Sequence, residues 1–274
     1  MNIKAPDANL TAFICVFLLV VLLAAPSADA LDLGTDITID DEISSSTTGW
    51  YGQEEDQEVE PGCVGSQAWD LEGFFLKGSE LQAVGGFDFK NGVANYPSYT
   101  TGDIFIDTDG STTSSITQTS YGQTNVNNNF GYEYVIDLSF DDYSYKVLKL
   151  NSDSTTVTVS YYQNQSSNPW KYAYGGTEIT GGGGTFAYYA DLLDADVDGL
   201  QGGSHYAITG FDLNFISGMA FTSHLTLGCG NDNLMGSGTA PVPEPATIIL
   251  MGTGLLGIAG VGRKKLKKSH TANG

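Results

Sequence analysis

The chain has 274 residues, and its 32 Asp and Glu residues against 11 Lys and Arg give a formal net charge of −21. An excess of negative charge on this scale repels phosphate groups and anionic lipids, which excludes a nucleic-acid-binding protein. Only 16% of the residues are charged and 35 are glycine, which excludes a coiled coil or helical bundle, while a hydrophobic share of 41% is enough to build a core.

The first 30 residues have the order of a secretory signal peptide. Lys4 precedes an uncharged apolar run at residues 13–25, and the segment ends on the small residues Ala28 and Ala30. We predict export through the secretion translocon and cleavage by signal peptidase between Ala30 and Leu31. A retained membrane anchor is the alternative, but the apolar run of about 13 residues is shorter than the roughly 20 that span a bilayer.

Residues 31–240 are predicted to form one extracytoplasmic domain. They hold 29 of the 32 acidic residues and five lysines, so their net charge is 5 − 29 = −24. The first part of the domain, residues 31–60, combines a Ser/Thr cluster with an acidic run. Such a composition indicates a flexible N-terminal segment with a solvated acidic loop, and a cation site in that loop is the alternative.

Alternation of apolar and polar residues is clearest at residues 132–140, where every even position is apolar or aromatic and shares one face of a strand. Asp141 and Asp142 are predicted to form a turn, because the alternation resumes at Tyr143 and gives a hairpin. A third strand follows at residues 156–161. Further strands are expected at residues 68–76, 81–89, 103–107, 185–189, 205–216 and 219–227.

Many short strands with glycine-rich turns predict an all-β fold, a single domain of the β-sandwich or jelly-roll type. No repeat of fixed length supports a β-helix. The four glycines at residues 181–184 are expected to form a loop, since a strand there would have nothing to pack.

Two cysteines, Cys63 and Cys229, remain once the signal peptide is removed. In an oxidising compartment an even pair predicts one structural disulfide. A catalytic cysteine paired with a histidine is the alternative, but no motif for an activated thiol surrounds either residue.

An acidic loop begins at Asp194, Asp196 and Asp198 and is followed by Gly199, which is the spacing that opens an EF-hand calcium loop. Its twelfth position is His205 where an EF-hand has a bidentate Glu. The pattern leaves two interpretations, a degenerate Ca²⁺ site and an ordinary acidic turn. A weaker candidate of the same kind contains Asp103, Asp107, Asp109 and Gly110, and there the alternative is turn chemistry at a strand end.

No recognisable catalytic motif occurs in the domain, so we predict no catalytic residues, no enzymatic activity and no cofactor other than the alternative of Ca²⁺. His224 is interpreted as a surface histidine, because it falls on the strand face opposite its apolar neighbours. Carboxylate pairs suited to glycoside hydrolysis stay open, since sequence gives no distances. The aromatic residues, with Trp69 and Trp170 near loops, leave core packing and a glycan-stacking platform as alternatives.

The C-terminal region has three parts in a fixed order. Pro243, Glu244 and Pro245 come first, then the uncharged residues 246–262, and then a basic cluster at residues 263–268. A helix of 17 residues is about 25 Å long, the lower limit for crossing a bilayer. Because Lys and Arg are retained on the inner side, we predict a transmembrane helix with residues 269–274 in the cytoplasm.

This order resembles the PEP-CTERM sorting signal of Gram-negative bacteria that produce exopolysaccharide, a tail also catalogued as an ice-binding C-terminal domain. The resemblance covers about 30 residues of the sequence, residues 241–268. It implies that an exosortase recognises Pro243, Glu244 and Pro245 and removes the helix and the basic cluster.

The resemblance and the missing catalytic motifs together predict a surface or extracellular-matrix protein, associated with biofilm exopolysaccharide, with a structural or adhesive β domain. It would reach the cell surface through an inner-membrane intermediate. A secreted carbohydrate-binding module is the first alternative, and a secreted glycan hydrolase is the second.

Overall fold

The computed structural model describes residues 30–39, 67–96, 98–112, 122–160, 168–230 and 232–243. Within them the protein is all-β, and its strands pair antiparallel in three sheets. The first sheet has the order β1 (Thr35–Asp36), β2 (Leu71–Lys77), β3 (Glu80–Gly85), β13 (His205–Asp212) and β12 (Ala187–Leu192). Three short 3₁₀ helices complete the elements of these described ranges: η1 (Gln67–Trp69), η2 (Asp194–Asp196) and η3 (Asn214–Ile216).

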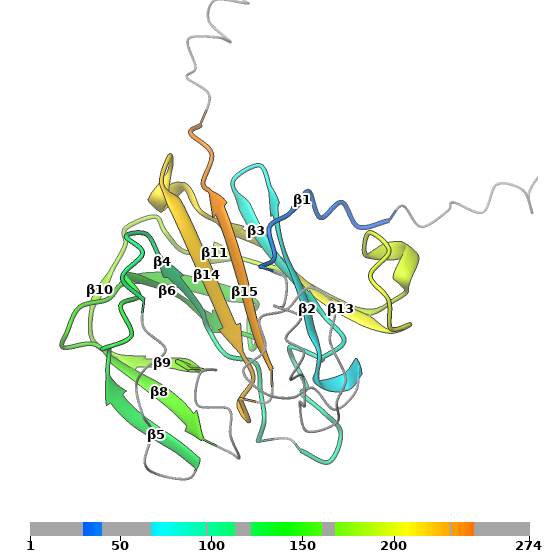
Figure 1. The fold of residues 1–274 in the computed structure, drawn as a ribbon, viewed down its shortest axis with the longest axis horizontal. Helices are drawn as coiled ribbons and strands as arrows, with labels where there is room; N and C mark the ends of the chain where they lie inside the picture. The colour runs from blue at the N-terminus through cyan, green and yellow to red at the C-terminus, as the bar shows by residue number, and fades with distance from the viewer. Residues whose placement is uncertain are drawn as a thin grey trace, which may run out of the picture.

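The second sheet is the largest. Its order is β10 (Thr177–Glu178), β7 (Ser144–Lys149), β6 (Tyr134–Ser139), β4 (Ile104–Asp107), β14 (Ala220–Thr226) and β15 (Asn233–Thr239), and β11 (Gly184–Thr185) also pairs with β7. The third sheet contains β5 (Gly122–Asn127), β8 (Thr155–Ser160) and β9 (Lys171–Tyr174). Figure 1 shows the third sheet at one end of the molecule, below the strands of the second.

The first and second sheets enclose the main hydrophobic core. Phe74 and Ile208 reach it from the first sheet, and Ile104, Ile136 and Leu225 reach it from the second. All five are fully buried, and burying a side chain of this size contributes about 1.5–3 kcal/mol. The predicted all-β sandwich is therefore confirmed.

The hairpin predicted from residues 132–147 is confirmed as β6 and β7, which pair from Tyr134 with Lys149 to Ser139 with Ser144. The hydroxyls of Ser139 and Ser144 donate to Oδ1 of Asp142 at 2.7 and 2.8 Å, which fixes the turn. Tyr132 departs from the predicted face, since its ring joins a different hydrophobic cluster.

That second cluster lies on the outer face of the second sheet. Phe105, Val135 and Leu148 supply its centre, and Val126 and Tyr172 of the third sheet pack against it. Both faces of the second sheet are therefore covered, which makes the domain a sandwich with a third layer that the sequence did not predict.

The loop expected at residues 181–184 extends only to Gly183, because Gly184 begins β11 and pairs with Tyr145. A Cβ atom on Gly183 would lie 2.6 Å from the carbonyl oxygen of Tyr145. Glycine is therefore needed here for the close approach of this chain to β7, which the sequence interpretation missed.

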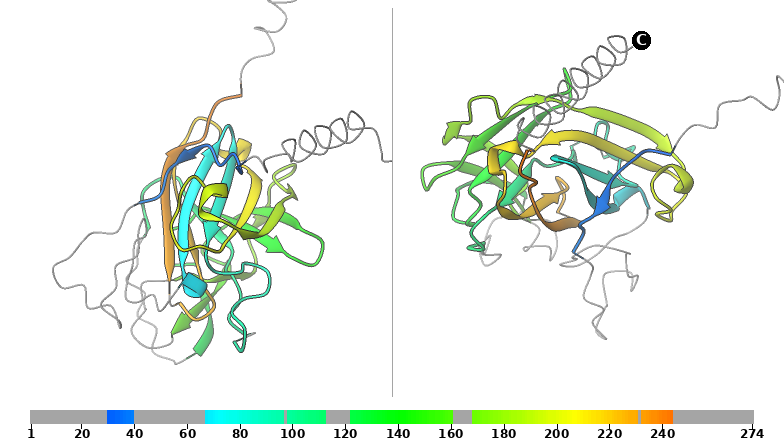
Figure 2. Two further views of the ribbon diagram at one scale, coloured as in Figure 1. Left: turned by 90° about the vertical axis from the view of Figure 1, so that its right-hand side faces the viewer. Right: turned by 90° about the horizontal axis from the view of Figure 1, so that it is seen from above.

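Residues 31–39, here called the closing segment, lie in the fold although the sequence assigns them to a flexible segment. The N–H of Ile37 donates to the carbonyl of Phe74 on β2, and the carbonyl of Ile37 accepts from Ser237 on β15. The N–H of Ile39 donates to Met235, also on β15. The closing segment thus supplies β1 at the edge of the first sheet and also bonds to β15 at the edge of the second. Figure 2 shows it in blue beside the strands of the first sheet.

No helix among the described residues is long and apolar enough to cross a membrane. The predicted signal peptide up to residue 29, residues 40–66 and the predicted helix at residues 246–262 lie outside the described residues, so these predictions stay predictions.

Candidate functional site

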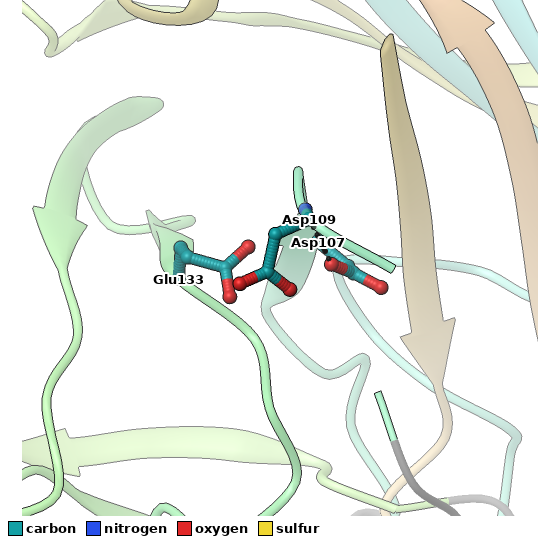
Figure 3. A group of neighbouring side chains, drawn as sticks. All are labelled: Asp107, Asp109 and Glu133. Atoms are coloured by element: carbon teal, nitrogen blue, oxygen red, sulfur yellow. Dashed lines mark hydrogen bonds between the residues drawn. The ribbon is translucent and has the colours of Figure 1, made fainter. Parts of the chain in front are cut away.

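Three carboxylates meet where β4 ends and β6 begins. Asp107, Asp109 and Glu133 each place one carboxylate oxygen so that the three atoms lie within 4.8 Å of one another. Figure 3 shows the side chain of Glu133 pointing toward those of Asp109 and Asp107. The three residues meet because β4 and β6 pair with Ile106 opposite Tyr134, which brings Asp107 beside Glu133.

The turn after β4 orients these carboxylates. Oδ1 of Asp107 accepts the N–H groups of Asp109 and Gly110 at 3.0 and 2.9 Å. Oε2 of Glu133 accepts both the N–H and the hydroxyl of Thr108, at 2.6 and 3.0 Å. These bonds hold one oxygen of Asp107 and one of Glu133 in place.

The electrostatics of the cluster differ between its members. Burial raises the pKa of Glu133, and the charges of Asp109 and Asp107 raise it further against the lowering effect of Thr108. The pKa of Asp107 is lowered, since the donated N–H groups outweigh the effect of its burial. Carboxylate oxygens in this arrangement suit a hard cation such as Ca²⁺, and they are the described residues best placed to hold one.

Asp103, grouped with Asp107 and Asp109 in the sequence, lies apart from them. Its side chain is buried and accepts the N–H of Leu138 on β6 at 3.1 Å and that of Tyr172 on β9 at 2.8 Å. Burial, with the charge of Asp137, raises the pKa of Asp103 to about 7. Asp103 therefore links the second and third sheets.

The loop at residues 193–204 contains the stronger sequence candidate for calcium. Oδ1 of Asp194 lies 2.9 Å from Nε2 of His205 and accepts the N–H of Gly203 at 2.7 Å. Oδ2 of Asp196 accepts the N–H of Leu193 at 2.9 Å. Within the described part of the chain, Asp194, Asp196 and Asp198 do not form a group with the geometry of a metal site, so calcium binding at this loop remains a hypothesis.

Asp194 and His205, the first and twelfth positions of this loop, instead contact one another. His205 then extends the hydrogen-bond network into the protein interior. Its Nδ1 lies 2.7 Å from Oε2 of Glu72, whose other oxygen accepts from Gln67 at 2.5 Å. Burial and the charge of Asp70 raise the pKa of Glu72 to about 7. Burial opposes protonation of His205, but its bonds to Asp194 and Glu72 raise its pKa overall. The network ties the loop to β2 and β13.

His224 is buried, which corrects its interpretation as a surface residue. Nε2 of the ring lies 2.9 Å from the carbonyl of Pro169, and the ring packs against Phe105 and Tyr132 of the second cluster. Burial lowers the pKa of His224 to about 4. His224 lies on β14, and both faces of the second sheet are covered. A side chain that points away from the main core is therefore still buried.

The two tryptophans have different environments. Trp170 is buried, and its Nε1–H donates to the carbonyl of Thr100 at 3.2 Å. Trp69 is half-buried and contacts Tyr96 and Tyr99, whose rings stack at 5.9 Å with an interplanar angle of 9°. Tyr96 is 51% exposed, so this three-ring cluster presents an aromatic surface.

Cys229 is buried in the main core. Cys63 lies outside the described residues, so the Cys63–Cys229 disulfide stays a prediction.

The domain ends where the sorting segment begins. After β15, the N–H of Ala240 donates to Met219 at 3.0 Å, and the hydroxyl of Ser217 donates to the carbonyl of Pro241 at 3.0 Å. Val242 is 68% exposed and Pro243 is also exposed. Glu244 and Pro245 lie outside the described residues, as does the basic cluster.

Comparison with known proteins agrees with this boundary. The model of the PEP-CTERM protein-sorting motif matches residues 241–264, and so begins at Pro241, the last residue that is bonded to the sandwich among those named above. No curated protein and no solved structure matches the chain. The motif implies export, sorting to the cell surface and an exosortase as processing partner, and the chain carries it directly after the β domain.

Proposed function

We propose that this chain is an exosortase-processed protein of the cell surface or extracellular matrix, whose β domain has a structural or adhesive role without catalysis. The observation that carries the proposal is the junction at Pro241. The last strand, β15, leads within two residues into the sorting motif, so a folded domain is delivered by a removable tail.

The chemistry of the buried groups supports a role without catalysis. Glu72 and Asp103 both have a pKa raised to about 7, as catalytic acids often do. Their oxygens accept hydrogen bonds from Gln67, Leu138 and Tyr172, which hold sheets and loops together. Groups used in this way stabilise structure.

The proposed location of the chain, at the cell surface or in the matrix, suggests which molecules it contacts. The resemblance of the tail to that of exopolysaccharide-producing Gram-negative bacteria makes the secreted polysaccharide or other matrix proteins the expected contacts. A domain with a net charge of −24 disfavours anionic lipid as a lasting partner, so we propose that the membrane serves only during processing.

Fractionation of the producing bacterium tests this proposal. The wild-type chain should accumulate at the surface or in the matrix, and a variant with Pro243, Glu244 and Pro245 all changed to Ala should remain in the inner membrane. Deleting residues 31–240 should reduce biofilm cohesion. Equal distribution of the two forms, or unchanged cohesion, would count against the proposal.

A carbohydrate-binding module is the second candidate, favoured by the aromatic cluster of Trp69, Tyr96 and Tyr99. Partly exposed aromatic rings offer an apolar body beside polar edges, which suits stacking on sugar rings. The Tyr96→Ala variant should lose most of its retention on the producer's polysaccharide. Tyr174→Ala is the matched control, because Tyr174 is also an exposed tyrosine, at 60%, but stands on β9 and is not part of the cluster.

The same incubation tests the hydrolase alternative. Retention without release of reducing ends supports a binding module. Release above background that a single carboxylate substitution abolishes would show a glycan hydrolase instead.

A further inference from the structure

The residues that follow the predicted signal cleavage site are held in the fold from the first one onward. Leu31 packs against a hydrophobic cluster on the outer face of the first sheet, and Leu33 is buried in that cluster beside Phe75 and Val197. The side-chain amide of Gln82 donates to the carbonyl of Leu33 at 2.7 Å. These contacts position the start of the closing segment, which then bonds to β2 and β15.

The main-chain nitrogen of Leu31 has a specific partner. It donates to the carbonyl oxygen of Asp196 at 2.9 Å. In the precursor this nitrogen belongs to a peptide bond with Ala30. Cleavage of that bond turns the nitrogen into an ammonium group, with a positive charge and three donor hydrogens in the same place.

The loop that accepts the hydrogen bond from this nitrogen is acidic, with Asp194, Asp196 and Asp198. Asp32 pairs with Lys77 at 3.0 Å, and Asp194 and Glu72 both pair with His205. In the described part of the chain, Asp196 and Asp198 have no basic side chain within ion-pair distance. The loop therefore carries two negative charges without cationic partners, in the segment whose carbonyl accepts from Leu31.

We propose that the loop at residues 193–204 is the binding site for the chain's own N-terminal ammonium, so that removal of the signal peptide strengthens the attachment of the closing segment to this loop. The inference rests on cleavage between Ala30 and Leu31, which belongs to the proposed export route. Capture of a terminal amine by main-chain groups is a known mode of recognition. It gives the acidic run of this loop a ligand other than Ca²⁺.

The test compares two forms of the chain that begin at Leu31 and continue to residue 274, in the same detergent. One form has a free amine at Leu31, and the other is acetylated there. At pH 6.5 the free form should melt about 2 °C higher, the size expected for one partly exposed ion pair in a domain this large.

The difference should depend on pH in a defined direction. An α-amine has an ordinary pKa of about 7.7–8.0, and binding to carboxylates raises it in the folded state. The stabilisation is then complete below the unfolded value and is lost as the pH rises through the folded value. The two forms should therefore melt together at about pH 10.

Asp198→Asn should reduce the difference between the two forms at pH 6.5. Asn tolerates the left-handed backbone at this position, where φ is 60°, so the loop keeps its conformation. Asp153→Asn, in the exposed turn between β7 and β8, is the matched control and should leave the difference unchanged.

Equal melting of the two forms at pH 6.5, or a difference that Asp198→Asn does not alter, would overturn the proposal. Both forms have defined N-termini, so this result is independent of where the cell cleaves the precursor. The export route would fail separately, in the fractionation experiment.

Discussion

Two acidic loops, at residues 107–110 and residues 194–199, share the pattern of alternating Asp residues before Gly, yet they use their carboxylates differently. At the first loop Asp107 and Asp109 face Glu133, a third carboxylate. At the second loop Asp194 is bonded to His205 and Gly203. The comparison teaches that the spacing of acidic residues does not tell whether their carboxylates come together in one group, because the partner from a neighbouring strand decides it.

The largest loss of stability should come from breaking the hydrogen bonds that His205 makes to Asp194 and Glu72 at the second loop. His205→Ala leaves Glu72 buried beside Asp70 without its histidine partner, which costs about 3 kcal/mol of unfolding free energy when a buried pair is broken. Urea denaturation measures this loss. Glu178→Ala, at an exposed position of β10, should cost almost nothing, and a loss below about 1 kcal/mol at His205 would contradict the account.

Calcium should distinguish the two loops directly. We expect millimolar Ca²⁺ to raise the melting temperature by about 3 °C through binding to the native state at Asp107, Asp109 and Glu133. Glu133→Gln should abolish the rise, and Asp196→Asn should retain it. The opposite result would move the cation site to the second loop, as the sequence first indicated.

The pH dependence of stability should reflect the second loop. Glu72 and His205 both have a folded-state pKa above the ordinary value. Their stabilisation is complete below the unfolded values and is lost as the pH rises through the folded ones, near pH 7 for Glu72. The loss between pH 6 and pH 8 should be on the order of 1 kcal/mol after screening. Glu72→Gln should flatten this slope, and an unchanged slope would refute the assignment.

The smallest expected change in stability comes from repulsion among the three carboxylates at the first loop. Without a cation, Glu133→Gln should raise the unfolding free energy by about 0.5 kcal/mol, because it removes one of three neighbouring negative charges. The amide oxygen of Gln can still accept from Thr108. Denaturant titration in a chelator measures the change, and a destabilised variant would show that the three charges do not repel one another significantly.

Much of the fold could be predicted from local patterns. The alternation at residues 132–147 identified β6 and β7, and Asp142 marked their turn. The third sheet could not be predicted in the same way, because β5 is mostly polar and only Val126 packs against the second cluster. The role of the closing segment was also missed, since its short pairings to β2 and β15 leave little periodicity.

The candidate site could be predicted only in part. Asp107 and Asp109 are neighbours in the sequence, but Glu133 joins them through the register of β4 against β6. Sequence alone does not give a register between strands that are separated by a long excursion. The same limit concealed the pairing of His205 with Glu72, which lie on β13 and β2.

The most direct test of the central claim is the intact mass of the exported protein, isolated from the surface or matrix of the producing bacterium. The account predicts a chain that begins at Leu31 and has lost the region after Pro245, including the basic cluster at residues 263–268. A mature protein that retains residues 263–268 would contradict processing by an exosortase and leave an ordinary tail-anchored protein.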